Sequence, residues 1–241
     1  MRAKWNLGDP NVAFTHRGSG RCADAAVPRR RVAVVVAVLI AAACARAQAP
    51  SNPNLNAQLL VAARNGDVAS VERVLRDGAA PNSRNRLGKT ALLMACEKGQ
   101  QPLATLLLHA GADVNLASLE GVTPLMAASY GGHAAIAREL LAAGARTEPR
   151  DRVHKDAWIY AAAQGHAEVV ATLLDAGVPV DGAGEHGLTA LMWAAGQGHA
   201  AVVKLLLQRG ARTDLRDDRG MSALDIAEAQ RHDAVVALLP R

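Results

Sequence analysis

The chain has 241 residues, 50% of them hydrophobic and 20% charged, so it can bury a core and is too apolar for a disordered chain. Only 2% of the residues are aromatic, so Ala, Leu and Val must fill the interior, and three cysteines exclude a disulfide-stapled secreted scaffold. Residues 1–49 hold eight of the 27 basic residues but only two of the 22 acidic ones, so the net charge of +5 belongs to that segment. The rest of the chain is nearly neutral, which excludes a basic face for binding nucleic acid.

The first predicted element in chain order is a signal peptide over residues 27–49. Three arginines, Arg29–Arg31, precede an uncharged apolar run, Val32–Ala45, and Ala47-Gln48-Ala49 places small residues where a signal peptidase reads them. As a helix this run would rise only about 21 Å, less than the roughly 30 Å of a bilayer core, so cleavage is favoured over an uncleaved anchor. We therefore expect cleavage near Ala49 and a periplasmic or secreted product, residues 50–241.

Two further expectations concern the same segment. Residues 1–26 show no periodicity and no second Met occurs before Met94, so we expect them to precede the natural start, with synthesis beginning at Val27 through a GTG codon. Cys44 follows three alanines, which suits lipid attachment, although the usual large aliphatic residue three positions earlier is missing. A lipid-anchored product therefore stays open as an alternative.

A period of 33 residues organises the rest of the chain. Two glycine ladders follow it: Gly66, Gly99, Gly132, Gly165 and Gly198, and Gly78, Gly111, Gly144, Gly177 and Gly210. Thr90, Thr123, Asp156, Thr189 and Ser222 keep the same step, as do His133, His166, His199 and His232. These ladders predict about six units: 52–84, 85–117, 118–150, 151–183, 184–216 and 217–241.

Each unit reads as turn, helix, helix and loop, and the third unit shows this most clearly. Gly121 suits a turn, Thr123 can cap a helix through its hydroxyl, and Pro124 suits the first helical position. A short helix follows and ends at Gly131-Gly132, and a second helix continues to Ala143-Gly144. One such pair cannot bury its own apolar face, so the units must stack on one another.

Gly121-Val122-Thr123-Pro124-Leu125-Met126-Ala127-Ala128, followed by Gly132-His133, resembles the ankyrin repeat, and residues 187–199 match it equally well. The resemblance covers residues 52–241 and implies an all-α repeat solenoid, an ankyrin-type stack of helix-turn-helix units with β-hairpin-like loops. The family's His within T-P-L-H is replaced by Leu93, Met126, Ile159, Met192 and Asp225, so we expect apolar contact to replace its hydrogen bond. The first unit has no capping Thr or turn glycine, so it should begin directly as a helix.

The sequence indicates no active site, and we predict no enzyme activity, cofactor or metal. Phosphate-loop, zinc-binding and nucleophile-elbow motifs are absent from the 241 residues, and the repeats leave no segment for a catalytic domain. The repeated histidines should each cap or tether their own second helix, and Cys96 falls where Ala162 and Ala195 fall, in the core. Only His154 and His186, at neighbouring hairpin tips, are placed to share a metal, and exposed tip histidines usually do not.

The predicted function is a non-enzymatic protein–protein interaction scaffold or inhibitor in an extracytoplasmic compartment. The resemblance implies that hairpin tips and first-helix ends form a concave surface for another protein, whereas the residues themselves do not identify that partner. We expect a monomer with no nucleic acid and no small-molecule substrate, and membrane contact only through a lipid at Cys44. A lipid-anchored envelope-organising protein and a cytosolic regulator are the alternatives.

The fourth unit departs most from the repeat, and it carries most of the predicted contact. His154 occupies a tip position at which four other units have glycine, and Arg152 and Lys155 make this tip basic. Trp158 should be core, whereas Tyr160 and Trp193 could face either the core or the groove. Exposed Tyr, Trp and Arg dominate binding hot spots. We predict that the partner contacts Tyr130, Arg152, Lys155 and Trp193, together with Arg86, Lys89 and Lys98 of the second unit.

Overall fold

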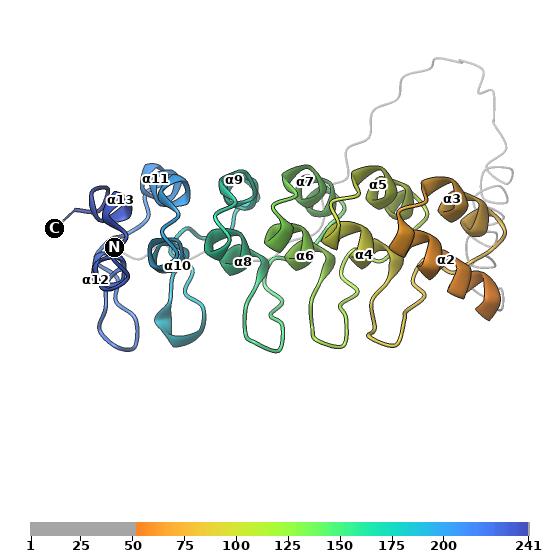
Figure 1. The fold of residues 1–241 in the computed structure, drawn as a ribbon, viewed down its shortest axis with the longest axis horizontal. Coiled ribbons are helices and arrows are strands. Elements are labelled where there is room, and N and C mark those ends of the chain that lie inside the picture. The colour runs from red at the N-terminus through yellow and green to blue at the C-terminus, as the bar shows by residue number, and fades with distance from the viewer. Residues whose placement is uncertain (1–51, 241) are drawn as a thin grey trace, which may run out of the picture. The chain divides into compact units, whose positions relative to one another are not determined.

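Residues 52–240 are described by a computed structural model of the chain, and they form a row of paired helices (Figure 1). The first helices of the pairs are α2 (Pro53–Asn65), α4 (Ala91–Glu97), α6 (Pro124–Gly131), α8 (Ala157–Ala163), α10 (Ala190–Gly196) and α12 (Ala223–Ala229). The second helices are α3 (Val68–Arg76), α5 (Gln101–His109), α7 (Ala134–Ala142), α9 (Ala167–Asp175), α11 (Ala200–Gln208) and α13 (Asp233–Val236). First helices pack on first helices and second on second.

The predicted all-α solenoid is confirmed, with a qualification about its loops. The long loops between pairs project together on one side of the row (Figure 1). Within residues 52–240 they contain no strand, only an isolated bridge between Ala183 and Thr189 and the 3-10 helix η1 (Glu185–Gly187). The predicted signal peptide at 27–49, residues 1–26 and Cys44 lie outside the described residues.

The repeated capping residues act as predicted. The side chains of Thr90, Thr123, Asp156, Thr189 and Ser222 each accept from the backbone amide three positions later, at 2.9–3.3 Å. These bonds satisfy amides that the first turn of a helix leaves free, so each first helix begins at a defined residue. In the first unit, α2 starts directly after Asn52, the first described residue, whose side chain caps it.

At the position of the family's missing His, apolar contact replaces the hydrogen bond in the inner units, as expected, but not in the last unit. Leu93, Met126, Ile159 and Met192 are buried, so apolar contact does replace a hydrogen bond there. Asp225 is different: its carboxylate accepts from the Ser222 amide at 2.8 Å while the Ser222 hydroxyl accepts from the Asp225 amide. This reciprocal capping box pairs two polar groups at the start of α12, where the inner units have an apolar side chain.

Of the two roles expected for the repeated histidines, capping their own second helices is wrong, whereas three of them do tether those helices. His133, His166, His199 and His232 occupy the N-cap position, but none of their side chains makes a capping bond. Instead three of the rings reach back to the first helix of the preceding unit. Their Nε2 atoms bond to the carbonyls of Tyr130, Ala163 and Gly196 at 2.9–3.1 Å. The histidines therefore join neighbouring units.

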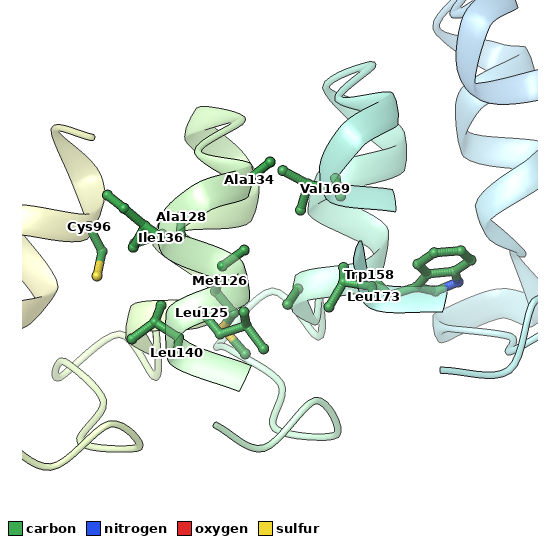
Figure 2. Packing of buried hydrophobic residues seen from close by; sticks show 14 of the residues in the cluster. Cys96, Leu125, Met126, Ala128, Ala134, Ile136, Leu140, Trp158, Val169 and Leu173 are labelled. Carbon is green, nitrogen blue, oxygen red and sulfur yellow. The ribbon is translucent and has the colours of Figure 1, made fainter. Parts of the chain in front are cut away.

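The core is a continuous layer of small and medium side chains between successive units. Ala134 and Val169 point toward one another between α7 and α9 (Figure 2). Trp158 is 4% exposed, which confirms its predicted place in the core. Cys96 is also buried, and desolvation raises the pKa of its thiol far above the ordinary value. Close packing of Ala, Leu and Val thus supplies the burial that a compact domain obtains from aromatic residues.

Candidate functional site

Three aromatic rings and one lysine form a continuous strip across α6, α8 and α10. The rings of Tyr130 and Tyr160 meet edge to face, with centroids 5.6 Å apart and planes at 84°. The ammonium of Lys155 lies 5.8 Å from the centroid of Tyr160 and 4.5 Å from that of Trp193. Both contacts are within the range of a cation–π interaction. We call these four residues the aromatic–lysine strip.

The repeat places each member of the strip. Tyr160 and Trp193 are one period apart, and each is the fourth residue of its first helix, so both rings pack partly on the core and partly face outward. Tyr130 lies near the end of α6, where its side chain is 56% exposed. Lys155 precedes the capping residue of α8, so its side chain reaches the gap between the two rings.

A buried carboxylate holds the fourth tip against the strip. Asp151, only 8% exposed, accepts from the amides of Val153 and Lys155 at 3.0 Å each through Oδ1. The Tyr160 hydroxyl donates to its Oδ2. Burial of the hydroxyl, reinforced by this hydrogen bond, raises the pKa of Tyr160 above its ordinary value, so the hydroxyl stays a neutral donor. One side chain thus fixes both the loop and the ring.

Hollows of different size lie beside the strip and behind it. One of about 370 Å³ is lined by Lys89, Glu97, Val122, Met126, Ala127, Tyr130 and Tyr160. Another, of about 430 Å³, is lined in part by Trp193 and lies between α10 and α12. A third, of about 510 Å³, lies between α7 and α9 and has no aromatic residue in its lining. A partner therefore finds large rigid side chains at the first helices, but not in the hollow between α7 and α9.

The structure brings together some of the predicted site residues and separates others. Tyr130 and Lys89 line one hollow, and Lys155 rests on Trp193. Lys89 is already paired with Glu97 at 2.6 Å.

The remaining predicted residues stand apart from the strip. Arg152 pairs with Glu120 at 3.3 Å on the exposed tips, and Arg86 is exposed on the second tip. Lys98 lies at the end of α4, where its ammonium donates to the Arg64 carbonyl in the first unit. Tyr160 was not among the predicted contact residues, although its position 33 residues before Trp193 would have indicated it.

Exposed apolar residues at three successive tips were also missed. Leu87, Leu119 and Val153 are each more than half exposed. The loops are polar overall in sequence. The 33-residue period does not distinguish a tip residue that faces solvent from one that packs on the neighbouring tip. The structure supplies that distinction.

The described residues hold neither a cluster of metal ligands nor a helix that could span a membrane. Within residues 52–240, no three His, Cys, Asp or Glu side chains are grouped as metal ligands, although His154, His186 and Glu185 line one hollow. In the same range no helix combines the length and apolar character that crossing a bilayer requires.

Comparison with known proteins decides the family. The family model for ankyrin repeats, which describes three copies, matches residues 59–152, 110–184 and 158–241. The chain belongs to the ankyrin repeat family. Its fold is also similar to the crystal structure of EF0377, an ankyrin repeat protein, with a TM-score of 0.70 and 28% identity over 76% of this chain and 96% of that one. No curated protein sequence matches. Ankyrin repeats are in general non-enzymatic modules of protein–protein interaction.

Proposed function

We propose that this ankyrin repeat protein is a scaffold or inhibitor that binds another protein at the aromatic–lysine strip, after export from the cytoplasm. The observation that carries the proposal is the exposure of Tyr130 beside Tyr160, next to a lysine stacked on Trp193. Large rigid rings that are already positioned lose little entropy on binding, which is one reason why Tyr and Trp, with Arg, dominate hot spots. The opposite surface, formed by the second helices, offers no such group in the described residues.

Site-directed crosslinking in intact cells tests the contact and identifies the partner. A photoreactive benzoylphenylalanine in place of Tyr130 should capture one protein, which mass spectrometry then identifies. The matched control places the same group at Arg138, which is exposed on α7. Equal capture at both positions, or none at position 130, would contradict the proposal.

Affinity measurements with the captured partner test the residues. Tyr130→Ala combined with Arg152→Ala should weaken binding by at least about 2 kcal/mol, roughly 30-fold, because an exposed ring and a rim cation are both lost. The melting temperature should not fall, since neither side chain is buried. An unchanged Kd in this folded variant would place the interface elsewhere, and Arg138→Ala serves as the control.

The location is tested on the product itself. Cell fractionation followed by N-terminal sequencing should find a chain beginning at Pro50 outside the cytoplasm. Retention of residues before Cys44 would overturn export. An acylated chain beginning at Cys44, with palmitate incorporation lost in Cys44→Ser, would instead support the lipid-anchored, envelope-organising alternative.

A further inference from the structure

Backbone hydrogen bonds connect most neighbouring hairpin tips in one register. Tips 2 to 6 comprise residues 85–89, 118–122, 151–155, 184–188 and 217–221. The amides of Leu119, Arg152 and Asp218 donate to the carbonyls of Leu87, Glu120 and His186, each at 3.0 Å and each 32 residues earlier. Between tips 4 and 5 the equivalent groups are the Glu185 amide and the Val153 carbonyl. Neither makes a hydrogen bond within residues 52–240.

A single residue accounts for this interruption. Tips 2, 3, 4 and 6 begin with Asn85, Ser118, Asp151 and Asp217, whose side-chain oxygens accept from amides further along the tip. Such bonds fix the path of a turn. Tip 5 begins with Gly184, which has no acceptor, and forms the 3-10 helix η1 instead. There His186 and Gly187 both adopt a left-handed φ, of 58° and 70°, whereas each of the other tips has one left-handed residue.

A hollow of about 200 Å³ lies at the interruption. Its walls include Val153, Ile159, Leu188 and Trp193, and its remaining lining comes from His154, Lys155, Gly184, Glu185 and His186. This volume is below the roughly 300–1,000 Å³ of sites for drug-sized ligands, so it suits one large side chain. Lys155 supplies a charge at its edge, and no carboxylate lies within ion-pair distance of its ammonium in the described chain.

We infer that the gap between tips 4 and 5 binds an extended segment of the partner protein that carries a large apolar residue next to an acidic one. The segment's backbone accepts from the Glu185 amide and donates to the Val153 carbonyl, as an added strand does at an open sheet edge. Its apolar side chain enters the hollow against Trp193, and its carboxylate pairs with Lys155. The inference rests on the proposed function, because it assumes a protein partner at the adjoining strip.

The free protein provides the first test. Amide hydrogen exchange should be faster at Glu185 than at Leu119, Arg152 and Asp218, which are bonded between tips. Gly184→Asp should introduce the missing acceptor: Gly184 has a φ of −84°, and a Cβ there would meet nothing closer than the Leu188 carbonyl oxygen at 3.5 Å. In that variant the Glu185 amide should become protected. Protection of this amide in the wild type, equal to that of the bonded ones, would overturn the inference.

A peptide titration tests the occupant. The probe is an eight-residue threonine–serine peptide with a central phenylalanine followed by glutamate, titrated into isotopically labelled protein. It should shift the Glu185 amide and the Trp193 indole signals. Replacing its glutamate by glutamine should weaken binding at least about tenfold in the wild type and have little effect in Lys155→Gln, because a charge-assisted pair needs both charges. Absence of these shifts, or an equal loss in both proteins, would overturn the inference whether or not Gly184→Asp alters tip 5.

The captured partner then separates this inference from the proposed function. Gly184→Asp should weaken its binding about tenfold or more, with Ala201→Asp, exposed in the first turn of α11, as the control. If Gly184→Asp leaves the Kd unchanged while Tyr130→Ala raises it, the gap is not used and the proposed function stands. If neither variant changes the Kd, both proposals are wrong.

Discussion

The stacking faces and the tip edge of this protein share one period, but they differ in how strictly each unit keeps it. At the faces, one position is alanine in five successive units and has no exposed surface in any of them: Ala95, Ala128, Ala161, Ala194 and Ala227. At the edge, the residue that begins each tip changes from Asn85 to Ser118, Asp151, Gly184 and Asp217. Packing against two neighbours leaves room for one shape, whereas a solvent-facing turn accepts several. Individual function can therefore reside at the edge.

The largest expected contrast is between a face residue and an edge residue. Leu191→Ala should lower the free energy of unfolding by roughly 2–5 kcal/mol, because this side chain is 2% exposed and its removal leaves a cavity between α8, α10 and α12. Val153→Ala, at a tip where the side chain is 59% exposed, should change it by less than about 0.5 kcal/mol. Urea denaturation measures both. A loss of less than about 1 kcal/mol for Leu191→Ala would mean that Leu191 is not a core residue.

The two glycine ladders sharpen the comparison, because both require a left-handed backbone but only one meets a neighbouring unit. Gly165 has a φ of 79°, and a Cβ there would lie 2.6 Å from Nδ1 of His199. Gly177 has a φ of 90° and nothing within 4 Å. Alanine should cost about 1 kcal/mol at Gly177 through backbone strain alone.

At Gly165 the cost should be larger by about 1 kcal/mol, because His199 must move and lose its 3.0 Å bond to the Ala163 carbonyl. Thermal unfolding of Gly165→Ala and Gly177→Ala side by side measures the difference. Equal losses would mean that the histidine contributes nothing to the contact between units.

The sequence predicts the features that lie within one unit, but not the contacts between units. The glycine ladders, the capping residues and the core position of Trp158 follow from local chemistry repeated at a fixed step, and those predictions are confirmed. The role of His166 could not be derived, since its bond to the Tyr130 carbonyl spans 36 residues and depends on how two units stack. The same holds for the contact between Lys155 and Trp193, and for the pairing of Arg152 with Glu120.

Acid should weaken the tip of the last unit. The hydrogen bond from the Met221 amide, reinforced by Arg219, holds the pKa of Asp217 below its ordinary value. A lowered folded pKa contributes stability that is present above an ordinary pKa of about 3.9 and is lost as the pH falls through the folded value. Asp217→Asn keeps an acceptor for Met221 but cannot ionise.

We therefore expect the melting temperature of the wild type to fall more steeply than that of Asp217→Asn as the pH is lowered from 5 to 3. At pH 7 the variant should be slightly less stable, because Arg219 loses its partner. Parallel curves over this range would show that the carboxylate of Asp217 is not responsible. Hydrogen exchange in α12 and α13 should locate the loss in the last unit.

The smallest expected effect has the opposite sign and lies at a capping position. Asp156 caps α8 where the neighbouring units use threonine, and desolvation raises its pKa despite the Ile159 amide and Arg150 nearby. A raised folded pKa means that the contribution to stability is fully present below the unfolded value near 3.9 and is lost as the pH rises through the folded value. At neutral pH the wild type therefore carries a partly buried charge that threonine would avoid while still capping the helix.

Asp156→Thr should raise the melting temperature slightly at pH 7, and the gain should shrink as the pH falls toward 4. The reverse exchange, Thr123→Asp, should be destabilising at pH 7 and less so in acid, because Thr123 is buried at the same position one unit earlier. If both exchanges lower stability equally at every pH, the fourth unit uses its aspartate for more than capping.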